Sequence, residues 1–198
     1  MGIPMELYFF CYDLNKINSE FNEICVKTRV YQFEQLFSDK SKITNERDAV
    51  FDFLKSFFRK EEADSSFVNA VEESTGSLNI DVAIASHENW KLRLHAYLDG
   101  KSSETFEPDV ICFDNRCDLG QWIHGPGQER LGKYPGFTAL VDNHKMFHYA
   151  ASNVVSLNQA GKNDDARKML DNQFNHFSEQ VVDILTALRK ISASRKPR

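Results

Sequence analysis

The sequence has few cysteines, no long apolar run and no surplus of positive charge. Its four cysteines among 198 residues are too few and too scattered for a disulfide framework. The longest uninterrupted apolar run is Leu7–Tyr12, far short of the roughly 20 residues that a membrane-spanning helix needs. The formal net charge is -5, and basic residues gather only in the C-terminal tail. These absences argue against membrane insertion, export and nucleic-acid binding, so we expect a cytoplasmic protein.

The composition divides the chain into two regions. Residues 1–80 contain ten of the sixteen phenylalanines and no histidine, whereas residues 82–191 contain all six histidines and both tryptophans. A turn-forming stretch, Ser74-Thr75-Gly76-Ser77, separates the two. We predict a mainly helical N-terminal region of unknown role at 1–80, a helical bundle at 81–191 and a solvated basic tail at 192–198.

The second region has the periodicity of bundle helices. Apolar residues recur there at alternating spacings of three and four, which places one apolar seam on each helix. The first helix is predicted to end at Asp99-Gly100, the second near Ala160-Gly161, and the third to follow Asn163. A short fourth helix is predicted between Asp114-Asn115 and Gly125-Pro126-Gly127. The expected fold is an all-α four-helix bundle with an N-terminal, mainly helical extension.

Three histidines occupy seam positions where apolar residues are expected. His144 and His148 are four residues apart, so both rings lie on one helical face about one turn apart. His87 lies on the inward seam of the first bundle helix. Burying three imidazoles without partners costs several kcal/mol in total, on the order of the penalty for any unpaired polar group. Either a metal ion or ordinary hydrogen bonds would satisfy them, and the spacing alone leaves both open.

The presence of Cys117 favours a metal ion over ordinary hydrogen bonds as the partner of these histidines. With Asp114 or Asn115 as N-cap, its sulfur would lie in the first turn of the short helix. Unpaired backbone N–H groups and the helix dipole there would favour the thiolate, which is the form that binds zinc. Three imidazole nitrogens and one thiolate complete a tetrahedral shell, so we predict a zinc site formed by His87, Cys117, His144 and His148.

The same residues carry a family resemblance. The segments 87–90, 117–122 and 144–148 read H-E-N-W, C-D-L-G-Q-W and H-K-M-F-H. They resemble, in order, the H-x-x-W, C-x-L/F-G-x-W and H-x-x-x-H motifs of the chemoreceptor zinc-binding (CZB) domain. Phe137 and Leu140 also match, and the resemblance extends over roughly Asp81–Ile191.

That resemblance implies a cytoplasmic, usually dimeric sensor bundle that is not an enzyme. In the family, the three histidines and the cysteine bind one zinc, and members sense zinc or oxidants such as hypochlorous acid. They are attached to chemoreceptor signalling domains or diguanylate cyclases. We therefore expect a homodimer that acts in bacterial chemotaxis or cyclic-di-GMP signalling, with a signalling protein as a possible partner.

Other interpretations remain open. The zinc could serve only as a static staple in an interaction module. A metalloenzyme would need an open coordination position, and a hemerythrin-like di-iron centre would need inward-facing carboxylates that the seams lack. His95, His124 and His176 are expected to be structural or exposed. Cys112 is expected to be a buried thiol, with a resolving role for oxidised Cys117 as the alternative.

Overall fold

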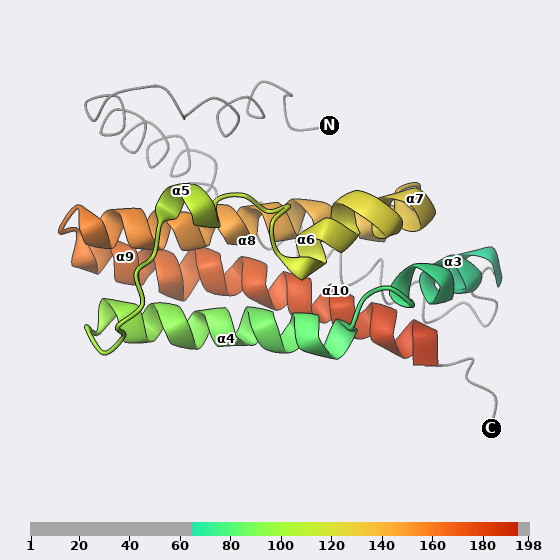
Figure 1. Cartoon of the computed structure of the whole chain (residues 1–198), viewed down its shortest axis with the longest axis horizontal. Coiled ribbons are helices and arrows are strands. Elements are labelled where there is room, and N and C mark those ends of the chain that lie inside the picture. Colours follow the sequence, from blue (N-terminus) through green and yellow to red (C-terminus); the bar gives the residue numbers. More distant parts are fainter. Residues whose placement is uncertain (1–64, 194–198) are drawn as a thin grey trace, which may run out of the picture. The chain divides into compact units, whose positions relative to one another are not determined.

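The computed structural model describes residues 65–193, and these residues fold as helices without any strand (Figure 1). The predicted all-α class is confirmed. Leu7–Tyr12, most of the predicted region 1–80 and most of the predicted tail 192–198 lie outside the described residues. Within the described residues, no helix has both the length and the apolar character needed to cross a membrane.

Three long helical segments form the body of the bundle: α4 (Ile80–Leu98), α8 (Pro135–Gln159) and the run from α9 (Asn163–Met169) through a π-helical turn into α10 (Asn175–Ala193). In Figure 1, α10 lies alongside α4, and it packs against both α4 and α8. The side chain of Asn79 caps α4 by accepting from the Val82 N–H at 3.1 Å.

Glycines terminate two of these helices as predicted. Gly100 and Gly161 follow α4 and α8 with φ of 67° and 74°, a left-handed conformation that costs glycine little.

Several short helices lie in and around the region of the predicted short fourth helix. α5 (Pro108–Ile111) packs against α8, and α6 (Asp118–Trp122) leads through a π-helical turn at Ile123–Gly127 into α7 (Gln128–Leu131). The expected start at Asp114-Asn115 is wrong, because residues 114–117 form turns and bends and Cys117 is itself the N-cap of α6. The Cys117 side chain accepts a hydrogen bond from the backbone N–H of Gly120, as an N-cap side chain typically does.

α3 (Ser65–Thr75) packs against α7 and α10. Its Phe67 and Val71 are buried and belong to the same apolar cluster as Trp122. The indole N–H of Trp122 donates to the carbonyl of Ser74 at 2.8 Å, which ties α3 to the short helix that follows Cys117. The predicted boundary at residue 80 stays a prediction, although α3 contributes to the core of the bundle.

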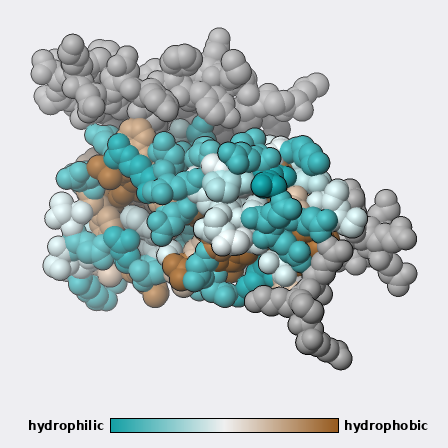
Figure 2. All heavy atoms as spheres, turned by 45° about the vertical axis from the view of Figure 1, so that its right-hand side comes forward, coloured by the Kyte–Doolittle hydropathy of each residue, from teal (hydrophilic) through white to brown (hydrophobic). Residues whose placement is uncertain are grey.

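The described surface is mainly polar on the face that Figure 2 shows, and its apolar residues form small separate groups. Among the described residues, the large apolar side chains with the greatest exposure are Val82, Leu92 and Val110. Scattered exposed apolar residues are normal for a globular domain. Most residues of the predicted seams are buried, so the seams face inward and contribute to the core.

Candidate metal centre

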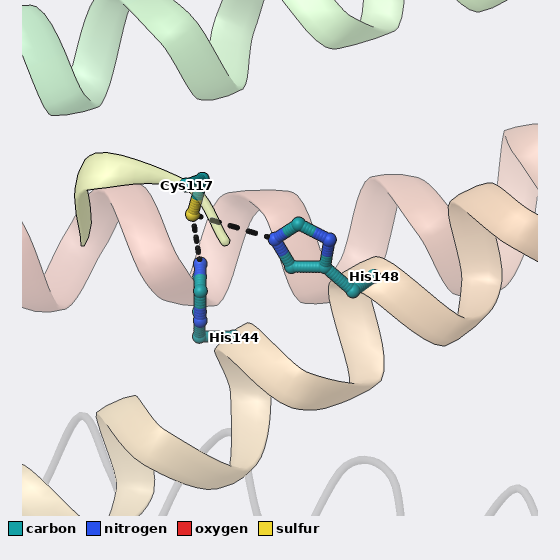
Figure 3. A group of neighbouring side chains, drawn as sticks. All are labelled: Cys117, His144 and His148. Atoms are coloured by element: carbon teal, nitrogen blue, oxygen red, sulfur yellow. Dashed lines mark hydrogen bonds between the residues drawn. The ribbon is translucent and has the colours of Figure 1, made fainter. Parts of the chain in front are cut away.

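Helix α8 positions two of the predicted ligands on its buried side. His144 is fully buried and His148 is 5% exposed. Their separation of four residues brings both imidazole rings to one face, with ring centroids 4.8 Å apart (Figure 3). Buried imidazoles at this spacing can bind one ion between them.

Cys117 faces these two rings from the start of α6. Its Sγ lies 3.3 Å from Nε2 of His144 and 3.6 Å from Nε2 of His148. Zinc bonds to sulfur at about 2.3 Å and to nitrogen at about 2.05 Å, so in a tetrahedral site sulfur and nitrogen lie about 3.6 Å apart. The candidate ligand atoms of Cys117, His144 and His148 all lie within 4.8 Å of one another. The two sulfur–nitrogen distances are therefore close to those of a zinc site.

His87 lies next to this group, on α4. Its ring centroid is 5.5 Å from that of His144, and its side chain is 3% exposed. Its Nδ1–H donates to the Ala83 carbonyl at 2.7 Å, which leaves the lone pair on Nε2. That Nε2 is buried and has no hydrogen-bond partner among the described residues. Such an unpaired acceptor is costly, and a metal ion at the centre would satisfy it. His87 lies outside the close three-residue group, so its role as fourth ligand stays a prediction.

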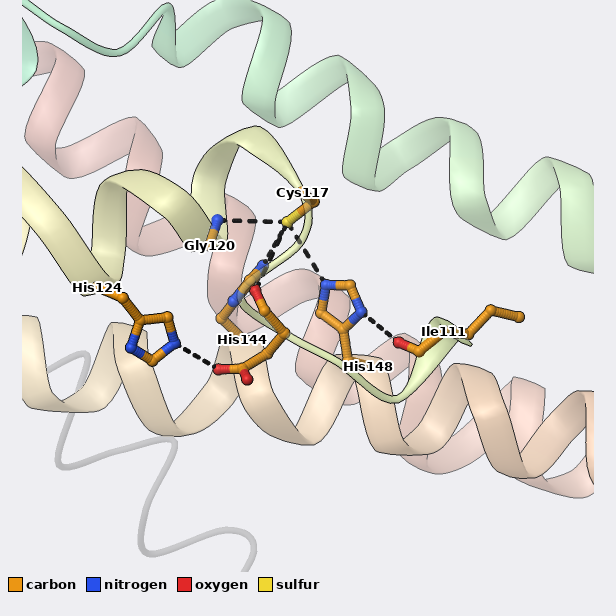
Figure 4. Close-up of polar contacts among 7 residues, drawn as sticks. Ile111, Cys117, Gly120, His124, His144 and His148 are labelled. Atoms are coloured by element: carbon orange, nitrogen blue, oxygen red, sulfur yellow. Dashed lines mark hydrogen bonds and ion pairs between the residues drawn. The ribbon is translucent and has the colours of Figure 1, made fainter. Parts of the chain in front are cut away.

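A backbone carbonyl orients His148. Its Nδ1–H donates to the carbonyl of Ile111 at 2.7 Å, so Nε2 carries the lone pair that faces Cys117 (Figure 4). Metal-binding histidines typically donate their second ring nitrogen in this way. The role of Ile111 could not be predicted from the sequence, because every residue has a backbone carbonyl.

Burial keeps the three imidazoles neutral. It lowers the pKa of His87 to about 4, although the hydrogen bond to Ala83 opposes the shift. Burial likewise lowers the pKa of His144 and of His148 below the ordinary histidine value. A neutral imidazole has the free lone pair that a metal needs.

Burial acts on the thiol in the opposite direction from our expectation. It raises the pKa of Cys117, and the backbone N–H groups of Gly120 and Leu119 lower it by less. The prediction that the helix start alone favours the thiolate is therefore wrong, because desolvation of the charged sulfur outweighs the N-cap hydrogen bonds. A bound cation would reverse this balance, since a coordinating thiol is deprotonated outright.

The remaining predicted candidates lie outside the three-residue group. His95 and His176 are half-buried, and His124 is exposed. Cys112 is a buried cysteine, and its Sγ–H donates to the Asp109 carbonyl at 3.4 Å. Trp122 packs edge-on against Phe137, with ring centroids 5.8 Å apart, and so acts as a packing residue beside the site.

A sulfur and two imidazole nitrogens form a donor set typical of zinc. The comparisons with known proteins agree: residues 87–155 match the family model of the chemoreceptor zinc-binding domain. This matched span begins at His87 and includes Cys117, His144 and His148. It is shorter than the span of the predicted bundle. No curated protein and no solved structure gave a significant match to the chain.

Domains of this family bind zinc and are regulatory, not catalytic. The motifs, the helical bundle and the cysteine–histidine group agree with that match in order and in geometry. The segment 87–155 belongs to the chemoreceptor zinc-binding domain family.

Proposed function

We propose that this chain is a zinc-dependent sensory protein, in which His87, Cys117, His144 and His148 bind a single zinc ion. It acts in the cytoplasm, in bacterial signal transduction of the chemotaxis or cyclic-di-GMP type. It works as a homodimer with a signalling protein as partner, and its signal is zinc itself or an oxidant such as hypochlorous acid. The Sγ of Cys117, close to two imidazole nitrogens, is the observation that carries this proposal.

The ligands differ in how firmly the fold holds them, and this difference supports sensing. His87 lies on a helix of 19 residues, and His144 and His148 lie on one of 25. Cys117 instead precedes a helix of five residues that runs into a π-helical turn with a kink at Gly125. Loss of the bond to Cys117 would therefore release a short element while the long helices stay packed.

Zinc would supply the positive charge that keeps Cys117 as a thiolate and joins the short segment to α4 and α8. The thiolate is the form that oxidants attack. Hypochlorous acid would transfer its oxygen to the sulfur, which gives a sulfenic acid and releases chloride. The oxidised sulfur is a weaker ligand, and the segment that begins at Cys117 would then move.

Four protein ligands leave no coordination position for a substrate or a water nucleophile. This supports a regulatory role over hydrolysis. The distance of 3.3 Å between Cys117 Sγ and His144 Nε2 also supports a cysteine that stays in the site at rest.

The test is metal analysis of the purified full chain beside its Cys117→Ala variant, before and after mild hypochlorite. Cys112→Ala is the matched control, because Cys112 lies five residues before Cys117 but outside the three-residue group. We expect one zinc per chain in the wild type and in the control, weaker binding in Cys117→Ala, and loss of zinc on oxidation. A wild type without zinc, or with two irons, would contradict the proposal.

The alternative function is a structural zinc staple in an interaction or dimerisation module. The burial of all three histidines favours it, since a buried ion exchanges slowly with solvent. Zinc that survives hypochlorite and leaves only on unfolding would support the staple. Light scattering of the zinc-bound and metal-free protein tests the sensor further, because a sensor should lose zinc while it stays folded and should then change its dimer geometry.

A further inference from the structure

The position of the Cys117 sulfur depends on an irregular segment. Residues 112–117 lie between α5 and α6 and contain turns and bends without a regular helix. A ligand on a long helix is placed by many backbone hydrogen bonds, whereas one at the edge of a loop depends on the few contacts that hold that loop.

A side-chain pair closes this segment around the cysteine. His124 Nε2 lies 2.9 Å from Oδ2 of Asp114, a contact that joins residues three positions before and seven positions after Cys117. In the view of Figure 4, His124 lies on the opposite side of His144 from His148. The Asp114 side chain is 20% exposed and that of His124 is 46% exposed.

The backbone beneath this pair is packed tightly. A Cβ added to Gly120 would meet the Asp114 carbonyl oxygen at 1.7 Å, so the chain before Cys117 crosses directly over the first turn of α6. The same carbonyl accepts from the Cys117 Sγ–H at 3.9 Å, a long contact. Asp114 therefore meets the cysteine through its backbone and meets His124 through its side chain.

We propose that Asp114 and His124 form a positioning pair that holds Cys117 Sγ against His144 and His148. The inference rests on the proposed zinc site and assigns the pair a specific part in it: it sets zinc affinity without touching the ion. Neither residue belongs to the three motifs that carry the family resemblance.

The test measures the zinc dissociation constant of the full chain by competition with a chromophoric chelator. His124→Ala and Asp114→Ala should each weaken zinc binding about 10-fold, the lower end of what loss of a supporting contact costs. Because both remove the same contact, the double variant should lose no more than either single one. His124→Gln, which keeps a donor, should recover most of the affinity, and His95→Ala should match the wild type.

A second measurement separates positioning from general stability. In the cobalt-substituted protein, the sulfur-to-cobalt charge-transfer band reports on the bond to Cys117, and it should weaken or shift in His124→Ala but not in His95→Ala. Thermal unfolding of the metal-free proteins identifies any variant that merely fails to fold, and the Asp114→Ala variant then tests the pair independently.

Unchanged affinity and an unchanged cobalt band in His124→Ala would overturn the inference and leave the zinc site standing. Fully additive losses in the double variant would also overturn it, because two independent contacts would then be involved. A wild type that binds neither metal would overturn the proposed function together with the pair.

Discussion

At the scale of single residues, the chemistry depends on which nitrogen of each imidazole carries the proton. In His87 and His148, a backbone carbonyl accepts from Nδ1–H and leaves the lone pair on Nε2. In His148 that lone pair faces Cys117, and in His87 it is buried without a partner among the described residues. In the metal-free fold, the lone pairs on Nε2 of these two histidines are therefore already in place. This preorganisation lowers the free-energy cost of metal binding.

Removal of His87 tests the fourth ligand. His87→Ala should weaken zinc binding by more than about 100-fold, since the loss of a direct ligand should exceed the 10- to 100-fold cost of losing a supporting contact. Chelator competition measures the change, with His95→Ala on the same helix as control. An affinity within about threefold of the wild type would restrict the site to Cys117, His144 and His148.

Zinc binding should release a defined number of protons for each ion bound. The buried histidines are already neutral at pH 7.5 because burial lowers their pKa, whereas burial raises the pKa of the Cys117 thiol, which stays protonated. Each zinc should therefore displace about one proton, and affinity should rise about 10-fold per pH unit while the thiol is protonated. Calorimetry in buffers of different ionisation enthalpy measures this number.

Cys117→Ala is the control for proton release, and its zinc binding should displace almost none. A release near zero in the wild type would show that Cys117 is already a thiolate without metal. A release near two would show that a histidine is protonated before zinc binds.

At the scale of elements, the segment of α6 and α7 also contacts α3. Trp122 follows Cys117 by five residues and donates to the Ser74 carbonyl at the end of α3. Arg130 of α7 forms an ion pair with Glu73, also on α3. A shift of the Cys117 segment would therefore reach α3 through a buried hydrogen bond and a surface ion pair, of which the exposed pair contributes little.

Gly120→Ala tests how closely this segment is packed. The added methyl group would overlap the Asp114 carbonyl, so the backbone must move, and unfolding stability should fall by about 1–3 kcal/mol. Zinc affinity should fall as well, because the same movement displaces Cys117. Urea unfolding and chelator competition measure the two effects.

Gly76→Ala is the matched control for the added methyl group. A Cβ at Gly76 meets its nearest neighbours at 3.7 Å, which is ordinary van der Waals contact. Its stability and zinc affinity should stay close to those of the wild type. Equal losses in both variants would attribute the effect to glycine replacement in general and not to the contact with Asp114.

At the scale of the whole molecule, three buried histidines make the metal-free bundle sensitive to acid. In the unfolded chain each has a pKa near 6.5, whereas burial lowers the pKa of folded His87 to about 4. Between these values the unfolded chain binds more protons, so the free energy of unfolding falls as the pH drops from about 6.5 to 4. For His87 alone this loss is about 3 kcal/mol, to order of magnitude.

Urea unfolding of the metal-free protein at pH 7.5, 6 and 4.5 checks the acid sensitivity. In His87→Gln, which has no titrating ring, the free energy of unfolding should depend less steeply on pH. A stability that does not vary between pH 7.5 and 4.5 would show that these imidazoles are solvated in the metal-free state.

The long helices and the buried positions of the three histidines could be predicted from the sequence. The ends of α4 and α8 follow from Gly100 and Gly161, and the seam spacing places His87, His144 and His148 inside. These features depend on residues close together in the chain, where helix period and local caps decide the structure. The family motifs could also be recognised from the sequence, because each is a short continuous stretch within one helix or at its start.

Only the tertiary structure decided which contacts support the candidate metal centre. The Ile111 carbonyl that orients His148 and the contact of Trp122 with Ser74 join segments that are far apart in the sequence. The start of α6 at Asp118 and the Asp114–His124 pair depend on the irregular path of the chain between α5 and α6. The protonation state of Cys117 also depends on the tertiary structure, because burial by surrounding residues raises the pKa of its thiol. Spacing along a helix sets which side chains share a face, but burial and backbone partners are set by packing between helices.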